Sequence, residues 1–298
     1  MRVLHLSDVH VTIPLSHFPW RQMLNKRFIG AVNLTLRRGR HYAHAREKLQ
    51  ALAEFSAEHD IDLVIATGDY TALGTDPELA AARQAIQALT TRPNGYVTVP
   101  GNHDIYLADV VREQRFERHF GEFLQSDLPE RCVDGPWPLV RLYGDRVAVI
   151  AVNSARPNPE PWRSNGAIPG AQLDALAALC RESRFQDRFV FVATHYAPRR
   201  ADATPDHHAH GLENADAFLD ACRGLKRGAI VHGHIHKRFQ LTLPNLRARI
   251  FGAGSTTCEG REGLWLFDID IDSAQATAVP GSYRAGRYVL EPDASVSF

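Results

Sequence analysis

The fold of this chain is decided by the stretch Gly228-Ala229-Ile230-Val231-His232-Gly233-His234-Ile235-His236. Its apolar start, Gly228 to Val231, predicts a buried strand that ends in a group of imidazoles. If the chain stays extended, the side chains of His234 and His236 leave on the same face, because they are two residues apart. Two imidazoles on one face are half of a metal-binding site. Taken alone, the stretch fits a surface histidine cluster equally well, so the choice depends on the rest of the chain.

Composition limits the class of protein before any other motif is considered. The 298 residues are 44% hydrophobic and 23% charged, which is typical of a globular protein with a sizeable core. Lys plus Arg equals Asp plus Glu, at 34 each, so the net charge indicates no partner. The sequence contains no run of about 18 apolar residues, so we expect no membrane-spanning segment.

The cysteines and the first residues bear on the cellular compartment. The four cysteines are far apart and include no C-x-x-C pair: Cys132, Cys180, Cys222 and Cys258. We therefore expect free thiols in a reducing compartment rather than a disulfide framework. The first ten residues have the pattern of a core strand followed by charged groups, so we expect no signal peptide. These features predict a cytoplasmic protein.

Strand-like and helix-like segments alternate along the chain up to about residue 236. The expected strands are 2–6, 62–67, 96–99, 147–152, 188–194 and 228–231, and the expected helices are 45–58, 109–124, 172–182 and two that start near 76 and 214. Beyond residue 236, three strands are expected without helices between them, at 238–243, 247–251 and 264–271. The alternation predicts an α/β layered fold with the helices outside.

Polar side chains of metal-binding type directly follow five of these strands. They are Asp8 with His10, Asp69, Asn102 with His103, His195, and His234 with His236. Taken singly, such residues are more often turn, core or surface groups than ligands. Because ligands in such sheets bind at the carboxyl ends of the strands, we expect these clusters to converge. Carboxylates mixed with imidazoles suit Mn, Fe, Zn or Co, and two ions sharing a bridging carboxylate account for so many groups better than one.

Convergence also decides the domain organisation. Length alone suggests about two domains. The clusters run from Asp8 to His236, however, so we predict that residues 1–298 form a single domain. It would carry a basic helical insert at about 14–44 and a β-rich tail from about 237.

The same residues resemble the calcineurin-like metallophosphoesterases, and within them the cyclic-nucleotide-phosphodiesterase-like branch. The family pattern is D-x-H, G-D, G-N-H-[DE], H and G-H-x-H. It is matched in order by Asp8-Val9-His10, Gly68-Asp69, Gly101-Asn102-His103-Asp104, His195 and Gly233-His234-Ile235-His236. The resemblance implies a four-layer α-β-β-α sandwich of two mixed sheets with a dinuclear metal site at the strand ends. It also implies that the β-rich tail completes the second sheet.

The resemblance implies a role for each matched position. One metal would be held by Asp8, His10 and His236, the other by Asn102, His195 and His234, with Asp69 bridging the two. His103 would face the scissile phosphate, where it can donate a proton or stabilise charge. Asp104 would either orient His103 or cap a following helix. The implied cofactors are two metal ions, with Mn or Fe leading and Zn or Co as alternatives.

The implied activity is hydrolysis of a phosphodiester or pyrophosphate P–O bond by in-line attack of a metal-bridging hydroxide. The motif leaves the phosphate-ester substrate open, and a small phosphodiester or cyclic nucleotide is the leading class. A catalytically silent scaffold is a remote alternative, because scaffold relatives are expected to lose ligands and here every motif position is filled.

The segment after His10 is unusual in its charge and its periodicity. Between residues 11 and 46 there are seven basic residues and no acidic one: Arg21, Lys26, Arg27, Arg37, Arg38, Arg40 and Arg46. Apolar residues recur every four positions, which predicts one or two amphipathic helices: Trp20, Leu24, Phe28, Val32 and Leu36. Basic and aromatic groups on such a helix suit a membrane surface or an anionic amphiphile.

This segment resembles the helical insertions of some UDP-2,3-diacylglucosamine hydrolases. A lipid-linked pyrophosphate is therefore the alternative substrate, with residues 14–44 as an acyl or membrane lid at the inner membrane surface. A packed surface helix pair and a dimer contact stay open, and the sequence leaves the oligomeric state undecided. A nucleic-acid groove is disfavoured, because the remaining chain has no basic stripe.

Five further residues are candidate substrate contacts: Trp20 and Arg27 in the insert, Arg156 and Arg163 on a proline-rich loop, and His210. His210 belongs to the tract Asp206-His207-His208-Ala209-His210, which follows the predicted ligand His195. The histidines of this tract are candidate pocket residues, with extra metal ligands and surface groups as alternatives.

Overall fold

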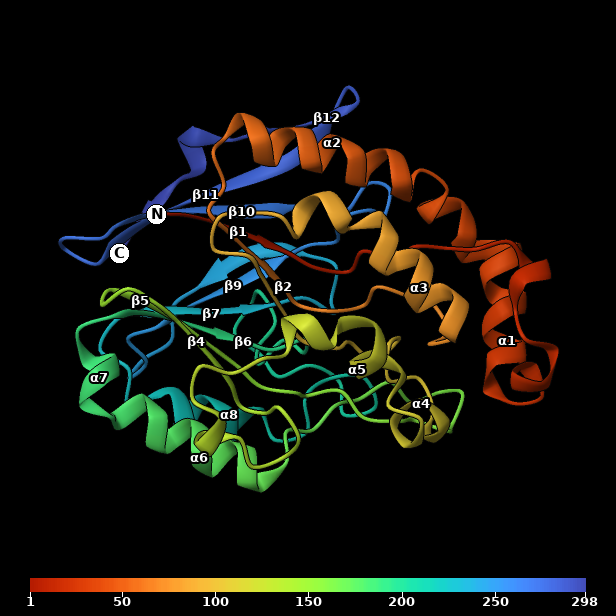
Figure 1. Cartoon of the computed structure of the whole chain (residues 1–298), viewed down its shortest axis with the longest axis horizontal. Helices are drawn as coiled ribbons and strands as arrows, with labels where there is room; N and C mark the ends of the chain where they lie inside the picture. Colours follow the sequence, from red (N-terminus) through yellow and green to blue (C-terminus); the bar gives the residue numbers. More distant parts are fainter.

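Two β-sheets lie face to face at the centre of the computed structural model, and helices cover both outer faces (Figure 1). The structure describes the backbone of residues 1–298 and every side chain except those of Leu15, Arg37 and Arg38. Both arginines belong to the predicted basic insert, so this part of the prediction lies outside the described side chains. The predicted four-layer sandwich of two mixed sheets is confirmed.

The first sheet has seven strands and the second has six. In spatial order the first contains β12 (Arg287–Leu290), β11 (Gln275–Arg284), β10 (Leu264–Asp270), β1 (Arg2–Leu6), β2 (Leu63–Ala66) and β3 (Tyr96–Thr98), with β13 (Val296–Ser297) paired to β11. The second contains β4 (Leu139–Tyr143), β5 (Val147–Ala151), β6 (Phe189–Ala193), β7 (Gly228–His232), β9 (Arg249–Ala253) and β8 (Arg238–Leu241). Both sheets mix parallel and antiparallel pairs, since β1 is parallel to β2 and antiparallel to β10.

The strands that precede the motif residues are parallel to one another within each sheet, and their ends are level. In the first sheet the register pairs Leu6 of β1 with Ala66 of β2, and Ala66 with Thr98 of β3. In the second sheet it pairs Ala193 of β6 with Val231 of β7. The residues that follow each strand therefore emerge at one edge of their sheet, where ligands bind in folds of this kind.

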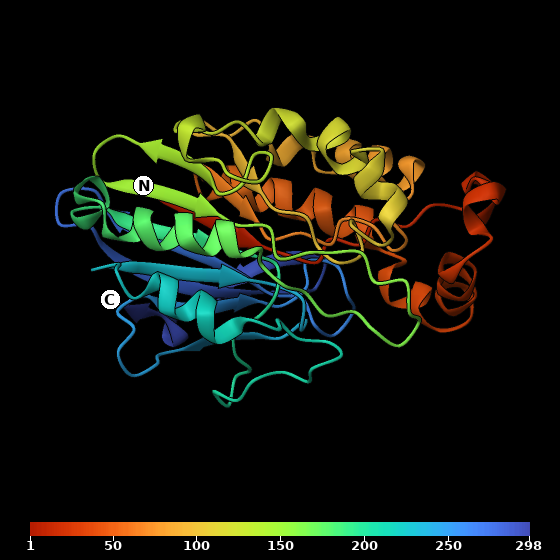
Figure 2. The ribbon, with the colours of Figure 1, turned by 90° about the horizontal axis from the view of Figure 1, so that it is seen from below.

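Helices bury one face each against the sheets (Figures 1 and 2). The first sheet packs with α2 (Ala45–Glu58), α3 (Asp76–Ala85) and α5 (Arg115–Phe120), and the second with α6 (Gly170–Arg181), α7 (Ser183–Gln186) and α8 (Ala215–Cys222). In α2, Leu49, Leu52 and Phe55 are buried because their spacing of three places them on one side of the helix.

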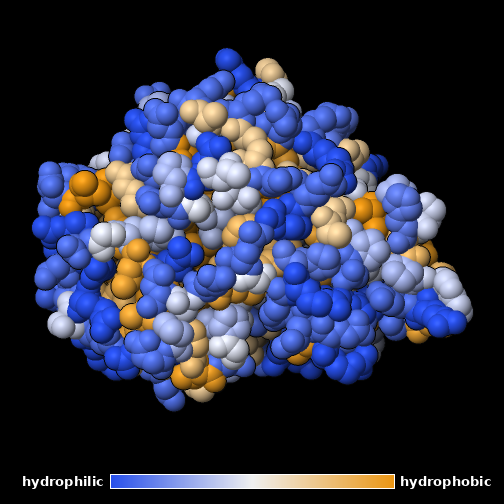
Figure 3. Space-filling view, in the orientation of Figure 1, coloured by the Kyte–Doolittle hydropathy of each residue, from blue (hydrophilic) through white to orange (hydrophobic). Residues whose placement is uncertain are grey.

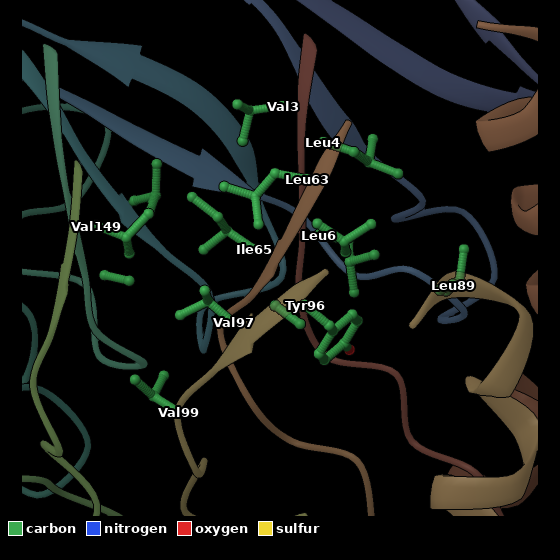
Figure 4. Close-up of a cluster of buried hydrophobic side chains, with 14 of the residues drawn as sticks. Val3, Leu4, Leu6, Leu63, Ile65, Leu89, Tyr96, Val97, Val99 and Val149 are labelled. Carbon is green, nitrogen blue, oxygen red and sulfur yellow. The ribbon is translucent and has the colours of Figure 1, made fainter. Parts of the chain in front are cut away.

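Aliphatic and aromatic side chains fill the space between the two sheets. Figure 4 shows Val3 of β1 on the side of Val149 from the second sheet, whereas Leu6 points to the opposite face of its sheet. Phe191 and Phe267 meet edge to face, with ring centroids 5.1 Å apart, and so join the sheets. Burying one such aliphatic or phenylalanine side chain stabilises the folded state by about 1.5–3 kcal/mol relative to leaving it exposed.

The β-rich tail divides between the two sheets. β8 and β9 extend the second sheet, but β10 to β13 join the first, where β10 pairs with β1. The implication that the whole tail completes the second sheet is therefore wrong for its last four strands. Sequence analysis also missed β11, because Pro280 and Gly281 are residues that strands disfavour.

The helix predicted at 109–124 is interrupted. The chain instead forms α4 (Ala108–Arg112), α5 and a short 3-10 turn, η6 (Gly121–Phe123). The break lies at Gln114, whose φ of 49° belongs to the left-handed region and cannot continue a right-handed helix.

The insert, residues 14–44, is helical and lies at one end of the molecule, beyond the edges of the sheets (Figures 1 and 2). Its elements are η1 (Leu15–His17), η2 (Trp20–Met23), α1 (Lys26–Asn33), the π-helical turn η3 (Leu34–Arg38) and η4 (Gly39–Tyr42). Ala31 and Tyr42 pack with Leu73 and Tyr106 in a small core of their own. Within the described chain, no helix is both long enough and apolar enough to cross a membrane.

Candidate metal centre

The predicted metal ligands stand on tight bends that follow the strands. Five of them have a positive φ: Asp8 (54°), His10 (42°), Asp69 (58°), His234 (71°) and His236 (49°). This conformation costs a residue with a side chain about 1–3 kcal/mol, and such strain collects at functional sites. The expectation that His234 and His236 stand on an extended chain is wrong, because β7 ends at His232 and the chain then bends.

Three consecutive hydroxyl groups hold the bend that carries Asp8. The side chains of residues 255–257 donate hydrogen bonds of 2.6–2.7 Å to the main-chain oxygens of residues 7–9. All six residues are buried, so these bonds are shielded from water and help to offset the backbone strain. Sequence analysis assigned no role to Thr256 and Thr257, because hydroxyl side chains are common in loops of every kind.

Four predicted ligands meet around one point and form what we call the first cluster: Asp8, His10, Asp69 and His236. One side-chain ligand atom from each lies within 4.8 Å of all the others. Nε2 of His236 lies 3.1 Å from Oδ1 of Asp8 and 3.2 Å from Nε2 of His10. Oδ1 of Asp8 is buried, and none of the described residues donates a hydrogen bond to it. A buried carboxylate oxygen and two imidazole nitrogens at such short distances form a ligand set that suits a bound cation.

A second cluster forms beside the first from Asn102, His195, His234 and the same Asp69. Oδ1 of Asn102 lies 3.1 Å from Nε2 of His195 and 2.9 Å from Nδ1 of His234. Oδ2 of Asp69 lies 3.5 Å from Nε2 of His195 and 3.9 Å from Nε2 of His10. One carboxylate oxygen therefore stands between the two clusters, which is the position of a bridging ligand.

Main-chain carbonyl groups orient three of the imidazoles: Thr71 holds Nδ1 of His10 (3.0 Å), Thr67 holds Nδ1 of His195 (2.6 Å), and His210 holds Nε2 of His234 (2.9 Å). A carbonyl oxygen can only accept, so the nitrogen facing it carries the proton. The other nitrogen of each ring then presents its lone pair to the cluster, as metal-binding histidines do.

Burial and the Asp8 carboxylate set the charge of the site. Burial would raise the pKa of Asp8, but the imidazole of His236 holds that pKa well below its usual range. Burial opposes protonation of His236, yet Asp8 raises the pKa of His236 to about 10. Burial lowers the pKa values of His195 and His234, so both are neutral near pH 7. Metals bind neutral imidazoles and ionised carboxylates, so a bound ion would have to displace the proton that His236 holds beside Asp8.

Two glycines permit the close approach of the ligand loops. A Cβ atom on Gly101 would overlap the carboxylate of Asp69, and one on Gly233 would overlap Ser7 and the carboxylate of Asp8. Gly101 and Gly233 are therefore needed for space rather than for flexibility.

Asp104 fastens two ligand loops together. Its Oδ1 accepts hydrogen bonds from the main-chain N–H groups of Tyr70 (2.9 Å) and Thr71 (3.1 Å), and its Oδ2 accepts one from Gly101 (2.9 Å). Burial and the nearby Asp69 raise the pKa of Asp104 to about 7. The expectation that Asp104 orients His103 or caps a helix is corrected, because its bonds run to the loops that carry Asp69 and Asn102.

His103 lies half-buried beside the first cluster. Its N–H donates to Oδ1 of Asp69 (2.8 Å), and its Nδ1 lies 2.6 Å from the carbonyl oxygen of Ala72. Its ring meets that of His10 edge-on at 5.3 Å and is stacked on Tyr106 at 5.8 Å. Because the Ala72 carbonyl fixes the proton on Nδ1, chemistry at this residue would use Nε2.

Residues 1–238 match the model of the calcineurin-like phosphoesterase family. The chain belongs to this family. The family predicted from the five motif blocks is thereby confirmed, and with it a metal-dependent phosphoesterase as the general class of protein. A search of curated proteins finds no match to this chain.

Solved structures share the fold at low sequence identity. A dimetal phosphatase from Danio rerio is 13% identical with a TM-score of 0.63, and the alignment covers 97% of this chain and 98% of that one. A purple acid phosphatase from yellow lupin (Lupinus luteus) seeds is 11% identical with a TM-score of 0.62, covering 99% of this chain and 53% of that one. These likenesses concern the fold.

In this calcineurin-like phosphoesterase both clusters border a cavity of about 920 Å³. One wall is formed by the insert through Ile29, Gly30 and Leu34, and His103 lies on the cavity surface beside the clusters. Five Lys and Arg side chains from distant parts of the sequence are also among its described lining residues: Lys26, Arg163, Arg200, Lys237 and Arg261. A cavity with carboxylate and imidazole groups at its base and cations around it suits an anionic phosphate ester.

The candidate substrate contacts divide into two groups. Among the described residues that line the cavity are Arg163 and His210, whereas Trp20 and Arg156 are not. The Arg156 guanidinium instead pairs with Glu213 at 2.5 Å. The expectation that Trp20 and Arg156 contact the substrate is corrected by these positions.

Arg27 is fully buried and serves the packing of the insert. Its guanidinium donates two hydrogen bonds to the carboxylate of Asp109, at 2.8 and 2.9 Å, and one to the main-chain oxygen of Leu73 at 2.9 Å. A paired, fully buried guanidinium has no reach into the cavity. The expectation that Arg27 binds substrate is corrected for this reason.

The sequence-based prediction included Trp162 of the cavity lining but assigned no role to Asp206, Tyr42 or Tyr106, which also line the cavity. Oδ2 of Asp206 lies 2.7 Å from Nδ1 of His210, and side-chain ligand atoms of Asp206, His210 and His234 lie within 4.8 Å of one another. In the histidine tract, His207 and His208 are not among the described lining residues. The one sequence signal for Asp206 is its position four residues before His210. No pattern indicates Tyr106, because aromatic side chains near a motif are usually core.

Proposed function

We propose that this calcineurin-like phosphoesterase hydrolyses a small phosphodiester or a cyclic nucleotide with two metal ions bound at the strand ends. The observation that carries the proposal is the position of Asp69 Oδ2, which lies 3.9 Å from His10 Nε2 and 3.5 Å from His195 Nε2. One carboxylate shared by two sets of imidazoles is the arrangement that a dinuclear site requires.

The two clusters divide the ligands. Asp8, His10 and His236 would hold one ion, Asn102, His195 and His234 would hold the other, and Asp69 would be shared by both. When bound, such ions act as Lewis acids and lower the pKa of a coordinated water, so that a nucleophile forms near neutral pH. Oxygen and imidazole ligands accept several metals, and we propose Mn or Fe, with Zn or Co as alternatives.

His103 is the proposed catalytic residue of the chain. Its Nδ1–H is held by the carbonyl of Ala72, so the imidazolium form can pass its Nε2 proton to the leaving oxygen of the ester and keep the proton on Nδ1. The bond from its N–H group to Asp69 ties its position to the bridging ligand. The basic side chains of the cavity, among them Lys237 and Arg261, attract the anionic substrate and hold it before the clusters.

The proposal is tested by hydrolysis of bis(p-nitrophenyl) phosphate. We expect Mn²⁺-dependent turnover that falls by at least about 10³-fold in Asp69→Ala, because several kcal/mol of metal-derived stabilisation are lost. Asp145→Ala is the matched control, since this carboxylate is fully exposed in the turn between β4 and β5. The bound metal is counted in both variants by elemental analysis. Full activity in Asp69→Ala would contradict the ligand assignment.

A lipid-linked pyrophosphate such as UDP-2,3-diacylglucosamine is the second candidate substrate. One observation favours it: Ile29 and Leu34 of the insert line the cavity, so an apolar tail could lie beside the phosphate site. Comparing the turnover of cyclic AMP with that of UDP-2,3-diacylglucosamine, with and without detergent micelles, separates the two classes. We also propose a cytoplasmic location, which the four free thiols support: Cys132, Cys180, Cys222 and Cys258.

A further inference from the structure

The insert turns an apolar stripe toward solvent. Of the ten large hydrophobic side chains that are exposed in the described part of the chain, six lie within residues 20–36. They are Trp20, Leu24, Phe28, Ile29, Val32 and Leu36, which we call the apolar stripe. Leu24 is 79% exposed, Leu36 75% and Trp20 68%. Exposed apolar side chains that gather in one segment mark an interaction site. In Figure 3 a few hydrophobic residues, in orange, lie among blue and white ones at the protruding end of the molecule, where Figure 1 shows α1.

The opposite face of the insert is firmly packed, so the stripe cannot rotate inward. Arg27 is buried in its bidentate pair with Asp109. Nζ of Lys26 donates to the main-chain oxygens of Asn158 at 2.8 Å and of Arg163 at 3.0 Å. These bonds fix the rotation of α1 about its axis and so keep Phe28 and Val32 exposed.

Packing at Gly30 reinforces this orientation. A Cβ atom there would lie 2.9 Å from Oη of Tyr106 and would overlap the side chain of Leu73. The helix thus approaches the body of the protein as closely as its backbone permits.

The segment that carries the stripe is also basic. Residues 11–46 contain seven basic residues and no acidic one. Arg21, Arg40 and Arg46 are exposed, and the guanidinium of Arg21 lies 5.2 Å from the ring centroid of Trp20. Aromatic and aliphatic side chains flanked by arginines are the composition of helices that lie in the interface of an anionic membrane.

We infer that the insert docks this protein onto the surface of an anionic phospholipid bilayer. The apolar stripe would enter the interface, and the exposed arginines would contact lipid phosphate groups. A second copy of the chain is the competing occupant, but a symmetric contact would bring the basic segment of one copy against that of the other. An anionic surface complements this charge, and a second basic surface does not.

Docking would bring the cavity close to the lipid headgroups. Ile29 of the stripe lines the cavity together with Gly30 and Leu34, whereas Phe28 and Leu36 are exposed and are not among its described lining residues. If the protein is the proposed hydrolase, its substrate would then be a phosphate ester held at a membrane surface. Docking itself needs neither a metal nor turnover, so it can be measured separately.

The first test is co-sedimentation of the intact chain with phosphatidylcholine vesicles, with and without phosphatidylglycerol. We expect binding to the anionic vesicles that weakens with added salt. Trp20→Ser, Phe28→Ser and Leu36→Ser together should lower this binding more than about tenfold. The matched control carries Val111→Ser, Val133→Ser and Ile271→Ser, which remove three exposed apolar side chains elsewhere and should leave binding unchanged.

A second pair of variants separates charge from apolar contact. Arg21→Gln with Arg40→Gln should weaken binding to anionic vesicles and reduce its salt dependence, because each arginine near such a surface contributes to attraction. Arg112→Gln with Arg223→Gln is the control, since both arginines are exposed outside the insert.

The inference is overturned if the intact chain binds no vesicles or if the stripe variant binds as tightly. It is equally overturned if the chain is a dimer by sedimentation equilibrium and the stripe variant is a monomer, since the stripe then serves a second copy. Turnover of bis(p-nitrophenyl) phosphate without vesicles should be the same in the stripe variant and the intact chain. Absence of that turnover in the intact chain would count against the hydrolase and leave the docking result standing.

Discussion

The strand-end clusters and the insert use buried and exposed side chains in opposite ways. In the clusters, ionisable side chains are buried against one another, and Oδ1 of Asp8 lies 3.1 Å from Nε2 of His236. In the insert, apolar side chains are exposed, while the buried guanidinium of Arg27 is fully paired. The clusters bury ionisable groups and the insert exposes apolar ones, and both are uncommon in folded proteins. Only in the clusters do the side chains themselves indicate the chemistry of the ligand. Buried carboxylate and imidazole groups indicate a metal ion as their partner. Exposed apolar side chains indicate that a partner exists but not which kind.

The largest effect on activity and stability is expected from removing metal from the two clusters. Exhaustive chelation should abolish hydrolysis of bis(p-nitrophenyl) phosphate, and Mn²⁺ should restore it. Chelation should also lower the free energy of unfolding, since an ion present at 1,000 times its Kd contributes about 4 kcal/mol to stability. Hydrogen exchange after chelation should increase in the bends at Asp8 and Asp69 and stay constant in α1. Equal increases in both regions would mean that the clusters and the insert are one cooperative unit.

Removal of His103 tests whether the clusters bind metal without performing the reaction. His103→Ala should lower kcat by about 10²–10⁴-fold, the usual contribution of a general acid or base. Metal content should stay at the level of the unsubstituted chain, because His103 is not among the proposed ligands. His119→Ala is the control, since this histidine pairs with Asp76 away from the clusters. A loss of bound metal in His103→Ala would make His103 a ligand.

Sequence alone predicted the clusters far better than the insert, for a physical reason. Each ligand is identified by residue type and by its position after a strand, and level parallel strands then bring all of them to one edge. The five positive φ angles could not be predicted, because non-glycine residues adopt them only when surrounding bonds hold them there. Hydrogen bonds to main-chain oxygens, such as that of Thr67 with His195, also leave no trace in the sequence.

Periodicity in the insert predicted helices but not the direction in which their apolar side faces. A spacing of four places Phe28, Val32 and Leu36 together whether the surroundings are core or solvent. The buried position of Arg27 depends on Asp109, which lies 82 residues away in the sequence. The single domain expected for residues 1–298 stays a prediction, because it concerns the cooperativity of unfolding.

Arg27 tests how firmly the insert is attached. Arg27→Met should lower the free energy of unfolding by about 2–4 kcal/mol, because breaking a buried pair leaves Asp109 without its main partner. Arg115 also contacts Asp109, at 2.9 Å, which keeps the loss below that of an isolated pair. Urea unfolding measures the change, with Arg112→Met as the exposed control. A loss below about 0.5 kcal/mol, as at an ordinary surface site, would mean that the insert is held by other contacts.

The same pair gives a stability that depends on pH. Burial opposes ionisation of Asp109, but the hydrogen bonds from Arg27 and the nearby Arg115 lower its pKa below the ordinary value. A lowered pKa in the folded state means that the contribution is present above the unfolded pKa of about 4 and is lost as the pH falls through the folded value. The difference in stability between the unsubstituted chain and Arg27→Met should therefore narrow below pH 4. A difference that stays constant down to pH 2 would exclude the ion pair as its source.

Asp104 joins the ligand loops, and its substitution should have an intermediate effect. In Asp104→Asn an amide N–H group replaces one acceptor and faces the N–H groups of Gly101 or of Tyr70 and Thr71. One unsatisfied buried donor costs about 1–3 kcal/mol. The variant should bind metal more weakly, because the loops of Asp69 and Asn102 are no longer fastened together. Metal titration followed by thermal unfolding measures both effects, and Asp104→Glu tests whether a carboxylate alone restores them.

The smallest effect on stability is expected where the exposed side chains are most numerous. Trp20→Ser, Phe28→Ser and Leu36→Ser together should change the free energy of unfolding by less than about 1 kcal/mol, because solvent-facing side chains contribute little to a folded state. Phe18→Ala, a buried residue of the same segment, should cost about 3 kcal/mol or more. Urea unfolding of both variants compares two faces of one segment. A large loss in the stripe variant would mean that these side chains pack against the chain in solution, and the contrast between insert and clusters would then disappear.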